Sequence, residues 1–296
     1  MKHINTLIVI SILAVGFNSC KSKKVQKAET GITNTQRQEA LDEADKMLTD
    51  SSFLMEESIE SKFQIIAEKN GIRLGYFINS EPFEDAKLKL NFPKNNANLP
   101  TGRVSFKYKV DNYELTAHSP YEDKCDCNKS DKGQHIHHIL NNNPYEARYT
   151  DTFSQVLPEG NYVMLSFLSR SYHEGIKTKD AFELSQFQVG ISYNSKRIDL
   201  DQPLLFYSRP KGVYKGKDIN NLLLDFYITN VNLSSDGYKV EVLIDDKTKF
   251  TLTEWRPYVL QGLGAGIHTI RLSLINKDNK SVGSLTEVAR KITLEN

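Results

Sequence analysis

Short apolar runs with alternating polar positions recur along most of this chain of 296 residues. Val, Ile, Thr, Tyr and Phe are frequent in these runs, and turn residues separate them, as is typical of β-strands. No long helical pattern interrupts the runs. The sequence therefore predicts an all-β fold of the β-sandwich kind. The predicted strands cover residues 86–92, 103–110, 135–140, 162–169, 182–189, 203–208, 222–231, 238–244, 249–255, 268–275 and 290–295.

A hairpin is predicted ahead of these strands. Residues 63–78 form two β-rich runs around Asn70-Gly71, a dipeptide that accepts the positive φ angles of a tight hairpin turn. Further upstream, apolar residues recur at helical spacing and predict a short amphipathic helix. These residues are Ala40, Leu41, Ala44, Met47 and Leu48.

The two halves of the strand-rich region resemble each other. Each contains a Leu-x-x-Gly turn, Leu157 to Gly160 and Leu263 to Gly266, that leads into a strongly apolar strand. We therefore expect two tandem immunoglobulin-like β-sandwich domains, residues 61–197 and 198–296. The matched segments are 104–115 with 222–233, 135–142 with 239–246, and 157–169 with 263–275.

The repeat makes the histidines of residues 135–140 informative. His138 aligns with Val242, which alternation places in a sandwich core, so we expect His138 in the core of the first sandwich. His135 and His137 then share the opposite face of the strand, where the second half has solvated charged residues. The first half also carries an 18-residue segment, 116–133, where the second has only five residues.

The N-terminus has the features of an export signal. Lys2 precedes an apolar run from Leu7 to Phe17, which is too short to span a bilayer, and Cys20 follows in the sequence FNSC. FNSC resembles the bacterial lipobox. We therefore expect a signal peptide over residues 1–19, lipidation of Cys20, and a polar tether with the short helix over residues 20–60. A secretory signal that happens to precede a cysteine is the alternative.

Composition excludes several classes of function. The chain has 38 Lys and Arg against 37 Asp and Glu, a net charge of +1, so no basic excess suggests a nucleic-acid partner. Gly-x-Ser-x-Gly, His-Glu-x-x-His and a glycine-rich phosphate loop are all absent. We therefore expect a non-enzymatic protein attached to the membrane through its lipid.

The histidines suggest a metal site. His135 and His137 lie two residues apart on one strand face, about 6.5 to 7 Å along the strand, so both imidazoles could reach one ion. Imidazole suits copper and zinc. His173 is the candidate third ligand, and affinity should fall as pH drops through about 6.5. The alternative is a structural role at the edge of the sandwich.

Cys125 and Cys127 could add soft ligands to that site. One residue separates them, so a disulfide between them would close a very small loop and be strained. A soft metal-ligand pair, a redox-labile pair and a solvated loop without such a role all remain open.

Arg170, His173 and Lys177, in the sequence SRSYHEGIK, form a second candidate site. Together with two serines they could hold a phosphate or carboxylate, because the guanidinium offers a planar fork to an oxyanion. The alternative for Arg170 is a charge paired at the end of a strand. This pattern suggests a protein or phosphopeptide partner.

Three segments carry a resemblance to a known family. KGQHIHHILNNNPY, LPEGNYVMLSFLSRSYHEGIK and PLLFYSRPKG are similar to segments of a Bacteroidetes-type family of envelope lipoproteins, some of which are labelled phosphopeptide-binding proteins. The resemblance covers most of residues 60–296. It implies that His135, His137 and His173 correspond to family histidines, with Arg170 and Glu174 in the same segment. An aliphatic residue is usual in the family at the position of His138.

These patterns predict a lipid-anchored envelope protein that binds copper or zinc through its His cluster. A protein or phosphopeptide interaction module and a purely structural envelope protein are the alternatives. Because no acidic residues follow Cys20 in CKSKK, we expect an outer-membrane lipoprotein that faces the periplasm.

Overall fold

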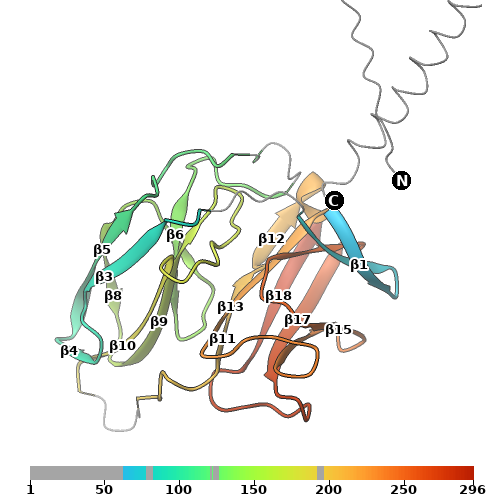
Figure 1. Cartoon of the computed structure of the whole chain (residues 1–296). Helices are drawn as coiled ribbons and strands as arrows, with labels where there is room; N and C mark the ends of the chain where they lie inside the picture. The colour runs from blue at the N-terminus through green and yellow to red at the C-terminus, as the bar shows by residue number, and fades with distance from the viewer. Residues whose placement is uncertain (1–62, 78–82, 121, 123–126, 192–196) are drawn as a thin grey trace, which may run out of the picture. The chain divides into compact units, whose positions relative to one another are not determined.

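The computed structural model describes residues 63–77, 83–120, 122, 127–191 and 197–296. The expected signal peptide, lipidated Cys20, tether and short helix lie outside these residues. Within them, no helix is long and apolar enough to cross a membrane. The described chain is built from strands, with a single 3-10 turn of helix, η1 (Gly216–Ile219), so the all-β prediction is confirmed (Figure 1).

The first sandwich is formed by two sheets from the first half of the described chain. Their facing sides enclose an apolar core that includes Phe106, Ile136, Met164 and Leu168. One sheet has the order β3 (Lys87–Phe92), β5 (Gly102–Asp111), β8 (Thr152–Leu157), and the other has the order β4 (Ala97–Leu99), β10 (Phe182–Val189), β9 (Gly160–Ser169), β6 (His135–Leu140), β7 (Glu146–Arg148).

The second sandwich has its own core, which includes Leu224, Phe226, Val242 and Leu272. One of its sheets has the order β1 (Phe63–Lys69), β2 (Ile72–Phe77), β16 (Tyr258–Gln261), β13 (Leu222–Thr229), β11 (Leu204–Arg209). The other has the order β12 (Gly212–Lys215), β18 (Glu287–Glu295), β17 (Gly266–Ile275), β14 (Lys239–Ile244), β15 (Thr248–Leu252).

The N-terminal hairpin belongs to the second sandwich. The turn is as predicted, with φ of 52° at Asn70 and 77° at Gly71. The expected boundary placed residues 61–77 with the first sandwich, but β2 forms an antiparallel ladder with β16. The hairpin extends a sheet that would otherwise end at β16, and sequence order alone did not reveal this pairing.

The internal repeat is visible in the strand register. β6 pairs with β9 so that Leu140 lies opposite Met164, and β14 pairs with β17 so that Ile244 lies opposite Ile270. These are the pairs that the alignment of the two halves matches. His138 is buried between Phe106 and Phe153 in the first core, as its alignment with Val242 predicts.

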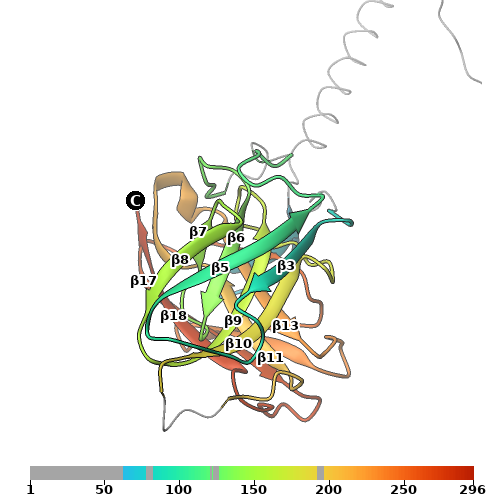
Figure 2. The same ribbon diagram turned by 90° about the vertical axis from the view of Figure 1, so that its left-hand side faces the viewer.

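A third apolar cluster joins the outer faces of the two sandwiches. β6 and β9 supply Ile139, Leu165 and Phe167, and β11 and β13 supply Phe206 and Tyr227. The rings of Phe167 and Tyr227 stack with their centroids 4.0 Å apart. Strands at this interface are buried on both faces, which explains why β11 and β13 are almost continuously apolar. Figure 2 shows these strands from the side of the first sandwich.

Candidate metal centre

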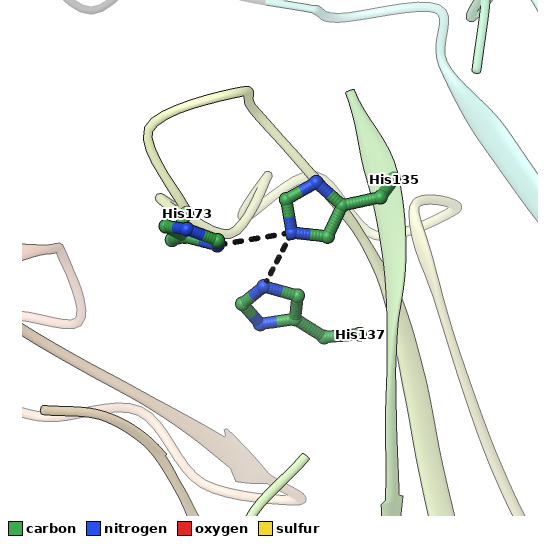
Figure 3. Close-up of side chains that lie close together, drawn as sticks. All are labelled: His135, His137 and His173. Carbon is green, nitrogen blue, oxygen red and sulfur yellow. Dashed lines mark hydrogen bonds between the residues drawn. The ribbon is translucent and has the colours of Figure 1, made fainter. Parts of the chain in front are cut away.

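Three histidines converge at the interface between the sandwiches. His135 Nε2 lies 2.9 Å from His137 Nε2 and 3.1 Å from His173 Nδ1 (Figure 3). One ligand atom from each of the three residues can be chosen so that all lie within 4.8 Å of one another. Both β6 histidines point away from the first core, as strand alternation predicts, and toward His173 in the loop after β9.

The backbone of that loop places His173. Its amide donates to the carbonyl oxygen of Arg170 at 2.9 Å, and the amide of Arg170 donates to the carbonyl oxygen of Glu174 at 2.9 Å. His173 itself has a φ of 68°, a conformation that is uncommon for a residue with a side chain. This tight turn carries the imidazole to the β6 histidines, and a sequence pattern of alternating strands does not predict it.

Neighbouring groups orient two of the three rings. His135 Nδ1 lies 2.8 Å from the carbonyl oxygen of Gly133. A carbonyl can only accept, so Nδ1 carries the proton and Nε2 presents a lone pair to the cluster. His137 Nδ1 lies 3.2 Å from Ser208 Oγ on β11. Such outer partners fix ring orientation and tautomer in metal sites.

Burial keeps the three imidazoles neutral. His135 and His137 are fully buried, and His173 is 7% exposed. Burial lowers the pKa of His135 to about 4 and holds the pKa of His137 and His173 well below the ordinary value. Neutral imidazole is the form that binds metal. Proton competition should therefore begin well below the pH of about 6.5 that the sequence alone suggested.

Two further residues, Tyr145 and Arg209, lie next to the three histidines. The Tyr145 ring stacks on His137 at a centroid distance of 3.5 Å, and its hydroxyl lies 3.2 Å from His173 Nδ1. Arg209 Nε donates to that hydroxyl at 2.9 Å. The sequence assigned no role to either residue, although both lie in segments, NNNPY and FYSRPKG, that carry the family resemblance.

The short distances between nitrogens limit the hydrogen bonds within the cluster. The lone pair of His135 Nε2 can accept from His137 or from His173, and not well from both. A metal ion about 2.0–2.1 Å from each nitrogen would instead use one lone pair from every ring. Three ligands of that bond length in tetrahedral directions lie roughly 3.3 Å apart, which is close to the two short separations at His135 Nε2.

Cys127 does not supply a thiolate to this cluster. Cys127 is disulfide-bonded, so its sulfur is not available as a soft ligand. It packs near Tyr172 and Phe77. Cys125 lies outside the described residues. Among the residues that the structure describes, only the three histidines form a metal-ligating group.

The expected anion site around Arg170 and Lys177 is already neutralised. Arg170 Nη1 lies 3.1 Å from Glu174 Oε1, with both side chains buried. Lys177 is paired with the buried carboxylate of Asp225 on β13 and also donates to the carbonyl oxygen of Phe226 at 2.9 Å. This arrangement is the paired-charge alternative for Arg170, and it leaves neither cation free to hold an external phosphate.

No known protein family and no curated protein matches the chain. Among solved structures, fibronectin(III)-like modules of Clostridium thermocellum CbhA are similar at 12% identity and a TM-score of 0.25, covering 70% of this chain and 94% of theirs. Bacteroides ovatus SGBP-B, solved with a mixed-linkage heptasaccharide, is 9% identical with a TM-score of 0.22, and 70% of each chain is covered. A chicken tenascin segment of two fibronectin type-III domains is 10% identical with a TM-score of 0.20, covering 70% of this chain and 98% of that one. Likenesses of this size carry no functional argument.

Proposed function

We propose that this protein binds one transition-metal ion, copper or zinc, through His135, His137 and His173. The observation that carries the proposal is the convergence of three buried, neutral imidazoles whose ligand nitrogens all lie within 4.8 Å of one another. Imidazole is a good ligand for both metals. The protein itself performs no catalysis in this proposal.

Charge favours monovalent copper over zinc at this site. The metal-ligating group contains no carboxylate among the described residues, and the cations of Arg209 and Lys211 lie close enough to contribute to the lowered pKa of His137 and His173. Each positive neighbour repels a divalent ion about twice as strongly as a monovalent one. We therefore expect Cu(I) to bind more tightly than Zn(II).

The test is a metal titration of untagged, metal-free protein. We expect His135→Ala to weaken Cu(I) binding at least tenfold, about 1.4 kcal/mol, because it removes the nitrogen that lies closest to both others. The control is His268→Ala. His268 lies on β17 and pairs with Asp245 at 2.7 Å, far along the chain from the cluster.

Two outcomes separate the alternatives. If His135→Ala and His268→Ala bind copper equally well, the cluster is a hydrogen-bond network that holds the two sandwiches together, and the purely structural function is favoured. Stoichiometric binding to wild type that disappears in His135→Ala supports the metal proposal. The phosphopeptide alternative is weakened because Arg170 and Lys177 already have carboxylate partners.

The proposed location is the periplasmic face of the outer membrane, through a lipid on Cys20. Wild type is expected to partition into detergent, whereas Cys20→Ser should not yield an acylated form because the thioether cannot be made. Labelling with a radioactive or alkyne fatty acid measures this. A mature protein that is cut at another residue and remains in the soluble fraction contradicts the lipid anchor.

A further inference from the structure

The interface between the sandwiches contains buried cations of two kinds. On one side, Arg170 faces Glu174 and Lys177 faces Asp225, so each positive charge has a carboxylate partner. This is the usual arrangement, since a buried charge is costly unless it is paired. The side nearer to β12 and β18 is different.

On that side, Arg209, Lys211 and Arg290 have no carboxylate within ion-pair distance among the described residues. Arg209 donates to neutral oxygens only, those of Tyr145, Tyr214 and Asn128. Lys211 Nζ donates to the carbonyl oxygen of Tyr145 at 2.8 Å. Within the described part of the chain, three positive charges thus gather without a carboxylate in direct contact.

Arg290 is the least satisfied of the three. Its side chain is buried, with 7% exposure, and its Nη2 donates to the carbonyl oxygens of Tyr207 at 2.6 Å and Asn142 at 3.1 Å. Its Nε and Nη1 are buried without any hydrogen-bond partner. Leaving donors of a charged group unpaired costs more than leaving neutral ones unpaired.

A cavity of about 290 Å³ lies beside these cations. It opens between the β6–β7 turn and the strands β12 and β18, and its lining includes Lys211, Arg290, Lys291, Asn142 and Asn143. No Asp or Glu of the described segments lines it. The volume is far more than a single water molecule needs.

We propose that this cavity binds a small oxyanion, of the phosphate or carboxylate class, between Lys211 and Arg290. The anion supplies the negative charge that this half of the interface lacks, and its oxygens accept from ammonium and guanidinium donors. Repulsion among the cations also favours an anion here. Burial and the charges of Arg209 and Arg290 lower the pKa of Lys211 to about 8, and the carboxylate of Glu146 opposes this effect only weakly.

This site does not require the proposed metal, but Lys211 also acts on the pKa of His137 and His173, so the anion is tested in metal-free protein. The probes are inorganic phosphate and acetate, each compared with sodium chloride at equal ionic strength. We expect phosphate or acetate to bind by calorimetry and to raise the midpoint of thermal unfolding above that in chloride, because a ligand of the native state stabilises it. The probe that binds with the higher affinity identifies the class of oxyanion.

The test variant is Lys211→Met, and its matched control is Lys215→Met, at the far end of the strand β12 that follows Lys211. Lys215 is exposed and pairs with Glu295, away from the cavity lining. We expect Lys211→Met to weaken anion binding at least tenfold and Lys215→Met to leave it unchanged. Equal affinity in wild type and Lys211→Met, or no effect of either probe beyond that of chloride, overturns the proposal.

A second variant supplies the missing charge from the protein itself. Asn143 is exposed at the cavity, and Asn143→Asp places a carboxylate there without a change of size. We expect this variant to unfold at a higher temperature than wild type in chloride and to lose most of its response to phosphate. A variant that is less stable than wild type and still responds fully to phosphate contradicts the proposal.

Discussion

At the scale of single residues, Gly133 positions the first histidine of the cluster. It has a φ of 76°, and a Cβ atom added there would lie 2.3 Å from the carbonyl oxygen of Thr116 and 2.5 Å from that of Ala117. Its own carbonyl oxygen accepts from His135 Nδ1. Gly133 is therefore required both for its backbone conformation and for the close approach of two chain segments.

We expect Gly133→Ala to destabilise the protein and to weaken metal binding together. Positive φ costs a residue with a side chain about 1–2 kcal/mol, and the clash with two backbone oxygens adds to this cost because backbone cannot move aside easily. Urea unfolding and copper titration measure the two effects.

Gly71→Ala is the matched control for that substitution. Gly71 has a nearly identical φ of 77°, but nothing lies within 4 Å of an added Cβ atom. This variant should show only the conformational cost and should retain full copper affinity. If the two alanine variants unfold at the same urea concentration, the crowding at Gly133 is not significant.

The sequence predicted part of this site. Strand alternation placed His135 and His137 on one face and His138 in the core, and the structure agrees. Tyr145 and Arg209 were missed because they are 64 residues apart and meet only where the two sandwiches pack together. Strand alternation predicts on which face of a strand a side chain lies, but it does not predict which other segment of the chain packs against that face.

At the scale of elements, the strands of the second sandwich depend on segments outside residues 198–296. β16 pairs with β2 from the N-terminal hairpin. The edge strand β11 is also completed from the first sandwich, because the Asn142 side chain accepts from the amide of Tyr207 at 2.9 Å and donates to the carbonyl oxygen of Leu205 at 2.8 Å.

A fragment of residues 198–296 is therefore expected not to fold as a stable monomer. It would expose the outer faces of β11 and β13, including Phe206 and Tyr227, which the first sandwich buries. Exposing large apolar side chains costs about 1.5–3 kcal/mol each, which is a large share of the stability of a domain of this size. The amide spectrum of the fragment measures this.

The matched control is residues 61–296, which retain both sandwiches and the hairpin. We expect a well-dispersed amide spectrum for residues 61–296 and a poorly dispersed one for the fragment. Two dispersed spectra would show that the sandwiches are independent domains, as the sequence repeat suggested. The repeat predicted strand register well, but the hairpin that completes the second sandwich has no counterpart in the repeat.

At the scale of the whole molecule, burial of histidines couples stability to pH. Burial lowers the pKa of His135 to about 4 and of His138 to about 3, and those of His137 and His173 also lie well below the ordinary value. In the unfolded chain these imidazoles titrate near 6.5. Below that pH the unfolded state binds protons that the native state does not take up, so stability falls with pH.

The expected result is full stability above pH 6.5 and a steep loss toward pH 4. At pH 5.5 His135 and His138, with pKa values of about 4 and about 3, each contribute a loss of about 1.4 kcal/mol, and the lowered pKa values of His137 and His173 act in the same direction. His268 has the opposite effect on the pH dependence of stability. Burial lowers its pKa, but the hydrogen bond with Asp245 outweighs burial, and the pKa of His268 is raised.

Urea unfolding of metal-free protein at pH 7.5 and pH 5.5 measures this loss. His138→Leu is the informative variant, because it removes one buried imidazole that lies outside the metal-ligating group, and its loss between the two pH values should be smaller by about 1.4 kcal/mol. Bound copper should raise the stability of wild type at both pH values without reducing this loss, because its ligands stay deprotonated in the native state while the unfolded histidines still take up protons. Equal stability of wild type at both pH values would mean that the buried histidines are protonated in the folded protein, which would also remove the basis for a metal site.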